Sequence, residues 1–147
     1  MAQTTTALSA CDAVIEVDND AGTPVDISGS SNNASLSMTR DVGEATTFDG
    51  DYKIRTECKR DASMSLKAFW TTAAAEARAT LEEWFDTGGK RTITVYPGGK
   101  VIGRRYYTGE FFLSGFDIAI DAGEAGPMSL DLEAVSSGAV GFLNVGS

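Results

Sequence analysis

The sequence predicts a mainly β fold of two packed antiparallel sheets, sandwich-like or barrel-like, with one flanking α-helix and a long protruding hairpin. Two observations carry this prediction. Segments in which apolar and polar residues alternate recur along the chain, which is the pattern of half-buried strands. Only one segment has the spacing of three and four residues that is typical of an amphipathic helix. Runs of strands around a single helix favour antiparallel packing over the regular strand–helix alternation of a parallel sheet.

About eight or nine segments have the alternation expected of strands. The first, 12–18, places its apolar side chains on one side and acids such as Glu16 and Asp18 on the other. The PGGK sequence at 97–100 predicts a tight hairpin turn between the two strands that flank it. The other expected strands are 25–27, 34–39, 63–70, 91–96, 101–108, 111–121 and 128–135.

The predicted helix covers about 72–87. Thr71 or Thr72 can cap its start, because a threonine side chain accepts hydrogen bonds from the free amides of the first turn. Trp84 and Phe85 can each bury about 150–250 Å², so we expect both to anchor the helix on the sheet. The apolar stripe of this helix consists of Ala73, Ala74, Ala77, Leu81, Trp84 and Phe85.

Residues 41–62 are the least regular part of the sequence. The segment is polar, its apolar residues show weak periodicity, and the Asp49-Gly50 pair suits a hairpin turn. We expect a long protruding hairpin or loop whose flanks can become strands on contact with a partner. A structureless stretch of about 20 residues is uncommon inside a compact domain, and it is usually functional or disordered.

The chain of 147 residues is expected to form one domain, 1–147, with a sizeable core. Residues 1–10 are expected to form a flexible N-terminal arm and not a signal peptide, because they lack a basic region and a long apolar stretch. The Gly-rich segment 136–147 is expected to form an edge strand or a C-terminal arm that docks on a neighbour. No apolar run approaches the roughly 20 residues of a membrane helix, so no membrane partner is expected.

The charge of the chain is acidic and segregated. There are 21 Asp and Glu against 12 Lys and Arg, a formal net charge of −9. Neither 1–39 nor 106–147 contains a Lys or an Arg, so all the bases lie in the middle of the chain. This balance disfavours a basic nucleic-acid-binding module. Segregated charge can steer one copy onto another, and an ordinary solvated surface is the alternative.

No set of residues indicates catalysis or metal binding. The chain has no His and no phosphate-binding loop, and Cys11 and Cys58 lie far apart. Two thiols without a His cannot complete a zinc shell unless carboxylates join them, so we expect no metal and no cofactor. Asp131 and Glu133 fall on the same face of one strand, which suits a solvated or assembly-facing surface better than an acid–base pair. We therefore expect a building block and not an enzyme.

Three sequence segments occur along the chain in a characteristic order. They are TTFDGDYKIRTECKRDASMSL, LEEWFDTGGKRTITVYPGGK and GEAGPMSLDLEAVSSG. From about Asp26 to Gly138 the sequence thereby resembles the tail tube (major tail) proteins of long-tailed bacteriophages. The resemblance implies a structural virion protein without catalytic residues. It also implies hexameric rings that stack head to tail into a hollow tail tube, through which double-stranded DNA passes during ejection without specific binding.

The resemblance further implies the location, the partners and two kinds of contact surface. The protein is expected in the virion tail, assembled in the bacterial host cytoplasm, with tape measure, tail terminator and tail tip proteins as partners. Inner sheets of adjacent subunits are expected to join into a barrel with an acidic lumen. The acids expected to line the lumen are Glu16, Asp18, Asp117, Asp121, Asp131 and Glu133. The hairpin is expected to reach a neighbouring subunit through Lys53, Arg55, Lys59 and Arg60.

A different class of protein fits the strand pattern as well. A small β-sandwich binding module that recognises carbohydrate or protein would use exposed aromatic side chains as its platform, and Tyr106, Tyr107 and Phe111 are the candidates. Rings or filaments of the purified protein would support the tube, and a monomer at all concentrations would support the module. A tube inside a contractile sheath and a sheathless tail are both compatible with the sequence.

Overall fold

A computed structural model describes residues 8–45, 48, 50–73, 76–120 and 128–146. Within this part of the chain no helix has the length and the hydropathy needed to cross a membrane. The elements are, in chain order, η1 (Ala10–Asp12), β1 (Val14–Asp18), β2 (Pro24–Asp26), η2 (Ser28–Ser30), β3 (Ser31–Ala45), β4 (Ile54–Phe69), α1 (Ala77–Thr87), β5 (Lys90–Tyr96), β6 (Arg105–Ala119), β7 (Ser129–Ser136) and β8 (Gly141–Asn144).

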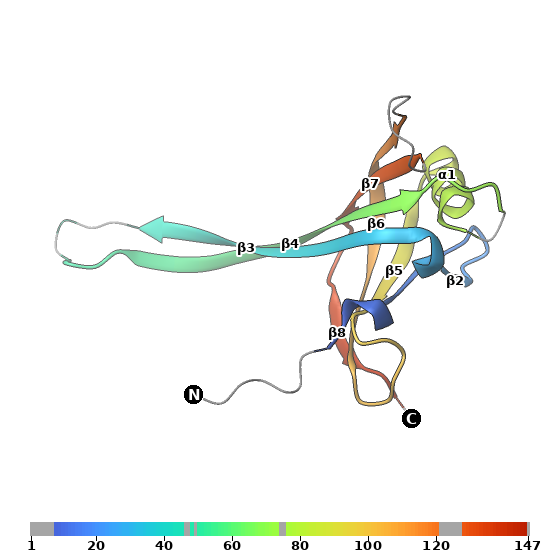
Figure 1. Ribbon diagram of the computed structural model, residues 1–147. Coiled ribbons are helices and arrows are strands. Elements are labelled where there is room, and N and C mark those ends of the chain that lie inside the picture. Colours follow the sequence, from blue (N-terminus) through green and yellow to red (C-terminus); the bar gives the residue numbers. More distant parts are fainter. Residues whose placement is uncertain (1–7, 46–47, 49, 74–75, 121–127, 147) are drawn as a thin grey trace.

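The described strands form one antiparallel sheet. Its order is β2-β1-β5-β6-β7-β4-β3, and β8 also pairs with β6. The mainly β class, the single helix and the long hairpin are thereby confirmed. The division into two separate sheets is not confirmed, because β6 pairs with β5 along one half and with β7 along the other and so joins both sides. Figure 1 shows the hairpin of β3 and β4 projecting far from the sheet body, on the side away from α1.

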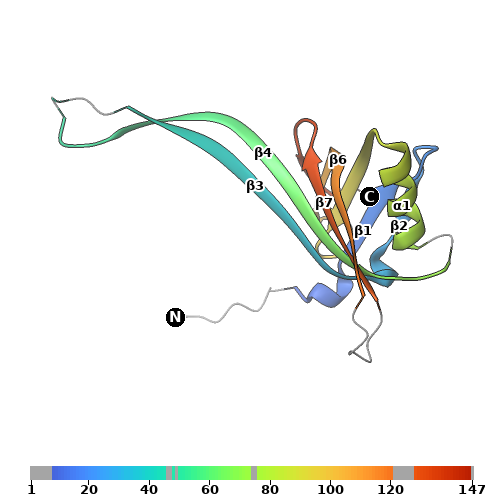
Figure 2. The ribbon, with the colours of Figure 1, turned by 90° about the horizontal axis from the view of Figure 1, so that it is seen from above.

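The single sheet curls until its two halves enclose one core. Ile15 of β1 and Ile93 of β5 meet Leu66 of β4 and Leu132 of β7 in one buried cluster. In Figure 2, β1 and β2 lie on one side of the central strands β6 and β7, and β3 and β4 lie on the other side. Because successive strand residues point to opposite faces, the remaining side chains of each half point outward, away from the core. The packing is therefore sandwich-like, although the hydrogen bonding is that of one sheet.

The two strands predicted at 101–108 and 111–121 are in fact one strand, β6. A register shift between Leu113 and Gly115 places a bulge at Ser114. A bulge adds one residue, so it changes which residues face the core: Leu113 does so before it and Phe116 after it. The sequence pattern has the same appearance whether the alternation is reset by a bulge or by a break between two strands.

The connection from β5 to β6 is longer than the predicted tight turn. Tyr96 ends β5 and Arg105 begins β6, so the PGGK sequence fills only the first half of the connection. The amide of Gly99 donates to the carbonyl of Tyr96 at 3.1 Å, and Gly99 has a φ of 79°, a conformation that glycine adopts without strain. A second turn follows, because the amide of Arg104 donates to the carbonyl of Val101 at 3.0 Å.

Helix α1 begins at Ala77, later than the predicted Thr72. Its N-cap residue is Glu76, whose side chain makes no cap hydrogen bond, so the predicted capping by Thr71 or Thr72 is wrong. The amide of Ala77 instead donates to the hydroxyl oxygen of Ser30 at 3.1 Å, and both residues are buried. The start of the helix is thus determined by a contact with a residue 47 positions earlier in the chain.

Only one of the two predicted helix anchors reaches the core. Trp84 is fully buried, and its indole N–H donates to the carbonyl of Gly89 at 2.9 Å. Phe85 is 53% exposed and stacks on Phe116 with ring centroids 5.7 Å apart, so its predicted burial is wrong. Consecutive helix residues are about 100° apart around the axis, and Trp84 already points to the centre of the core.

The predicted hairpin at 41–62 is confirmed, but its flanks need no partner to become strands. β3 extends to Ala45 and β4 starts at Ile54, and the two strands pair with each other as far as Ala45 opposite Ile54. Each flank therefore satisfies the backbone groups along one edge of the other. For 136–147, the described residues show the edge-strand alternative, since β8 pairs with β6 of its own chain.

Candidate assembly surfaces

Three of the predicted channel acids share one outer face of the sheet. Asp117 of β6 lies opposite Asp131 of β7, and Asp131 lies opposite Lys67 of β4, whose Nζ is 3.8 Å from Asp131 Oδ1. Glu133 lies on the same face, opposite Gly115 of β6. The neighbouring positions on β3 and β4 are occupied by small hydroxyl side chains, namely Ser35, Ser37, Ser63 and Ser65. We call this surface, made of the three acids and the four serines, the acid–serine face.

Glu16 and Asp18 lie on the outer side of the other half of the sheet. Glu16 pairs with Lys100, and this hydrogen bond raises the pKa of Lys100. Burial raises the pKa of Asp18, against the opposing effect of a hydrogen bond with Thr92. Because β1 and β7 meet across the core, these two acids point away from the acid–serine face. Asp121 lies outside the described residues.

The four predicted hairpin bases fall into two groups. Lys53 Nζ is 3.2 Å from Glu44 Oε1, and Arg55 Nε is 3.7 Å from Glu44 Oε2, so both bases already pair within their own hairpin. Lys59 and Arg60 lie nearer the root, where they line a groove. The structure therefore places the second group, more than the first, where a segment of another molecule could contact it.

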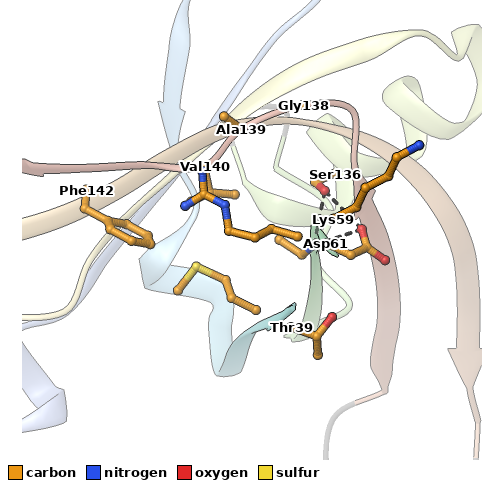
Figure 3. Close-up of a pocket in the computed structure, with 11 residues that line it drawn as sticks. Thr39, Lys59, Asp61, Ser136, Gly138, Ala139, Val140 and Phe142 are labelled. Carbon is orange, nitrogen blue, oxygen red and sulfur yellow. Dashed lines mark hydrogen bonds between the residues drawn. The ribbon is translucent and has the colours of Figure 1, made fainter. Parts of the chain in front are cut away.

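The groove beside the hairpin root has a volume of about 420 Å³ and is shown in Figure 3. Met38 of the hairpin and Phe142 of β8 give it an apolar lining, together with Val140. At its inner wall the amide of Ala62 donates to the hydroxyl oxygen of Ser136 at 3.2 Å. The charged side chains of the groove are Lys59, Arg60 and Asp61. Its apolar walls suit an extended chain segment, and its lining offers no nucleophile–base pair for catalysis.

Among the described residues, two strand edges of the sheet body are left without a partner, in addition to the side of β4 from Ile54 to Asp61 that faces away from β3 in the projecting hairpin. β3 is the last strand of the sheet, so one side of its 15 residues is unpaired. β5 pairs with β6 only as far as Lys90 opposite Phe112, so the same side of β6 is unpaired from Leu113 to Ala119. Unpaired edges are templates for pairing with another chain. Alternation in the sequence does not reveal which strands are neighbours, so it could not identify these edges.

An apolar patch adjoins the free edge of β6. It consists of Phe85, Phe116, Ile118 and Ile120, and we call it the aromatic edge patch. Ile118 is 47% and Ile120 is 72% exposed. The sequence pattern does not reveal this patch, because alternation does not distinguish an apolar residue of the core from one at an open edge.

The aromatic platform of the alternative binding module is not present. Phe111 is only 2% exposed and belongs to the core. Tyr106 stacks on Tyr96 with ring centroids 5.1 Å apart, and Tyr107 packs edge-on against Phe142 at 5.5 Å. Their rings are therefore engaged within the sheet and with β8.

Unpaired strand edges, an acidic outer face and a projecting hairpin are typical of a self-associating structural protein. Comparison with known families identifies which one. The family described as phage tail tube protein matches residues 7–142, and the chain belongs to it. The protein is thus a structural component of the virion tail of a phage-like particle and not an enzyme, as the sequence predicted.

Solved structures show the same fold. The tail of an empty gene transfer agent particle, determined with C6 symmetry, has a TM-score of 0.74 and 21% identity, covering 93% of this chain and 99% of that one. A chain from the baseplate of the anti-feeding prophage has a TM-score of 0.73 and 15% identity, covering 97% and 99%. The SPP1 tail tube has a TM-score of 0.67 and 12% identity, covering 96% and 80%. No curated protein matches the chain.

Proposed function

We propose that this protein assembles into hexameric rings that stack into a hollow tube, through which double-stranded DNA passes during ejection. The observation that carries the proposal is that the acid–serine face lies on strands β6, β7, β4 and β3, which are bounded on both sides by a free edge. The six-fold symmetry of the similar gene transfer agent tail supports a ring of six.

Ring closure follows from pairing between unlike edges. The free edge of β3 and the free edge of β6 are different surfaces, so pairing them gives a head-to-tail contact. Such contacts close into a ring when the rotation between neighbouring copies is a whole-number fraction of 360°. All pairs within the chain are antiparallel, so β3 runs antiparallel to β6 and continues the alternation across the contact. A closed barrel removes every edge of this four-stranded unit, which otherwise invites aggregation.

The acid–serine face supplies a suitable lining for a DNA channel. Asp117, Asp131 and Glu133 repel phosphates, and Lys67 neutralises only part of this charge. The serines are small and uncharged, so they give DNA no charged group to bind. Glu16 and Asp18, on the opposite half, are outside this lining. Asp121 remains a candidate from its position in the sequence.

The hairpin is the proposed bridge between subunits. Lys59 and Arg60 line the groove at its root, and Lys53 and Arg55 form an ionic cluster with Glu44 nearer its tip. Acidic segments of a neighbouring copy are the complementary partners, since both ends of the chain contain acids and no bases. The baseplate and cap assemblies of similar tubes support further contacts with tail tip, tail terminator and tape measure proteins.

Negative-stain electron microscopy of the purified protein tests the proposal. We expect rings with six-fold class averages and, at higher concentration or beside tail tip proteins, tubes of stacked rings. A protein that stays monomeric at high concentration, also in the presence of tail tip proteins, would overturn it.

A further inference from the structure

An apolar pair of side chains lies beside the acids and serines of the acid–serine face. Phe112 of β6 and Val135 of β7 lie directly opposite each other, and they are 44% and 42% exposed. Both point outward, because the residue before each of them, Phe111 and Ala134, is buried in the core. Val135 also lies opposite Ser63, one of the four serines of this face. We call these two residues the Phe112–Val135 pair.

The chemistry of the pair suits a polypeptide and not DNA. Proteins contact the phosphates and sugars of duplex DNA through basic and polar groups, and phenylalanine and valine are neither. Apolar side chains gain free energy when the apolar surface of a partner removes them from water. The Phe112–Val135 pair therefore fits a ligand that has apolar side chains of its own.

The backbone around the pair excludes a ligand that binds as an additional strand. Phe112 is paired with Val135 on one side and with Lys90 of β5 on the other, and Val135 is paired with Phe112 and with Ser63. Both edges of both strands are thus occupied at this point, so a ligand contacts side chains alone. An amphipathic helix binds such a surface through its apolar stripe. The nearby charge of Lys90 is already paired, since its Nζ is 3.6 Å from Glu110 Oε2.

The charges beside the pair define the polar part of the ligand. Glu133 and Asp131 precede Val135 on the same side of β7, in steps of two residues, or about 7 Å each. Lys67 lies opposite Asp131 and neutralises part of this charge, whereas Glu133 lies opposite Gly115, which has no side chain. An apolar stripe flanked by Lys or Arg is complementary to this arrangement.

We propose that the Phe112–Val135 pair binds an amphipathic α-helix of another protein inside the channel, and that basic side chains flank the apolar stripe of this helix. The inference rests on the proposed tube and gives its channel a polypeptide ligand besides DNA. One pair offers a small apolar contact, so each contact is weak. Copies around a ring repeat the pair, and a helix held by one copy meets the next at a high effective concentration.

Retention of a model helix by assembled tubes tests this inference. The probe is a fluorescein-labelled peptide of leucine and lysine with its leucines three and four positions apart, and a scrambled peptide of the same composition is its control. Tubes are assembled with each peptide and sedimented. The test variant combines Phe112→Ser with Val135→Ser. The matched control combines Val101→Ser with Ile102→Ser, which removes an apolar pair that is 49% and 67% exposed on the β5–β6 connection.

We expect tubes of the unsubstituted protein and of the control variant to retain the helical peptide, and tubes of the test variant to retain at least ten-fold less. Equal retention by the two variants, equal retention of the scrambled peptide, or no retention would overturn the inference and leave the proposed function standing. Loss of tubes from the folded test variant alone would show that a second copy covers the pair, which also overturns the inference. An unsubstituted protein that forms neither rings nor tubes would overturn the proposed function and the inference with it.

Photo-cross-linking gives a second measurement that needs no substitution in the protein. A benzophenone group replaces one leucine side chain of the helical peptide, and tubes of the unsubstituted protein are irradiated with the peptide bound. Mass spectrometry of the digest should locate the cross-links at 111–113 and 134–136. Cross-links confined to other segments would contradict the inference.

Discussion

Arg91 of β5 holds Glu83 of α1 through two contacts, with Nη1 2.6 Å from Oε2 and Nη2 2.8 Å from Oε1. Arg91 is buried, and Thr87 at the end of the helix also accepts a hydrogen bond from it at 3.3 Å. The helix is thereby fixed to the sheet at its C-terminal end by a charged pair and at its N-terminal end by Ser30. These two fixed points determine where Phe85 is presented at the free edge of β6.

The Glu83–Arg91 pair should make stability depend on pH. The hydrogen bond from Arg91 lowers the pKa of Glu83 below its usual value of 4.5. A lowered folded-state pKa stabilises the fold at pH values above the unfolded-state pKa, and this contribution is lost as the pH falls through the lowered value. We expect Glu83→Gln to lower the melting temperature at pH 7, and the difference from the unsubstituted protein to shrink in strongly acidic buffer. Thermal unfolding from pH 7 to pH 2 checks this, and a pH-independent difference would contradict it.

Trp84 and Phe85 should differ sharply in their contribution to folding. Removal of a fully buried tryptophan side chain costs about 3–5 kcal/mol, so Trp84→Ala should destabilise the monomer by that amount. Phe85→Ala removes an exposed ring with one stacking contact, so we expect about 0.5–1.5 kcal/mol. Denaturant unfolding of the monomers measures both. Equal losses would show that Phe85 belongs to the core after all.

Charge reversal on the acid–serine face should affect passage of DNA without affecting the fold. Replacement of Asp117, Asp131 and Glu133 with Lys leaves the buried layer intact, so tubes should still form. The lining then attracts phosphates, and DNA ejection from assembled particles should slow by at least ten-fold. The neutral Asn, Asn and Gln variant serves as the control with an intermediate effect. Unchanged ejection from the Lys variant would refute the lumen assignment.

Deletion of the projecting part of the hairpin should separate folding from assembly. Removal of 44–60 joins Gly43 to Asp61, just before the first buried residue of β4, Ala62. The monomer should therefore keep its sheet and unfold cooperatively, while ring stacking is lost. Circular dichroism and electron microscopy together give the readout. Normal tubes from this variant would refute the bridging role.

Local sequence patterns determine much of the fold. Alternation within the predicted strand 63–70 places Met64, Leu66 and Ala68 on one face, and this face of β4 is buried whereas the other is not. It also predicted that Asp131 and Glu133 share an outer face. Which side chains share a face of a strand depends only on the sequence of that strand, so the sequence is sufficient to predict it.

Properties that depend on distant segments were not predictable in this way. Ser30 lies in a polar loop sequence that gives no sign of its bond to Ala77. The six predicted channel acids have the same local pattern, yet curling of the sheet puts Glu16 and Asp18 on one side and Asp117 on the other. Phe85 has the spacing of a core residue, but the orientation of α1 on the sheet, which is set by distant contacts, points Trp84 into the core and leaves Phe85 53% exposed.

The bulge at Ser114 constrains how this protein can change over time. Its hydroxyl donates to the carbonyl of Glu133 at 3.1 Å and holds the extra residue in place. Loss or gain of a single residue between Ser114 and Asp117 would move every later residue of β6 to the opposite face, turning Asp117 toward the hydrophobic interior and Ile118 toward the acid–serine face. The length of this stretch is therefore constrained whichever side chains it carries.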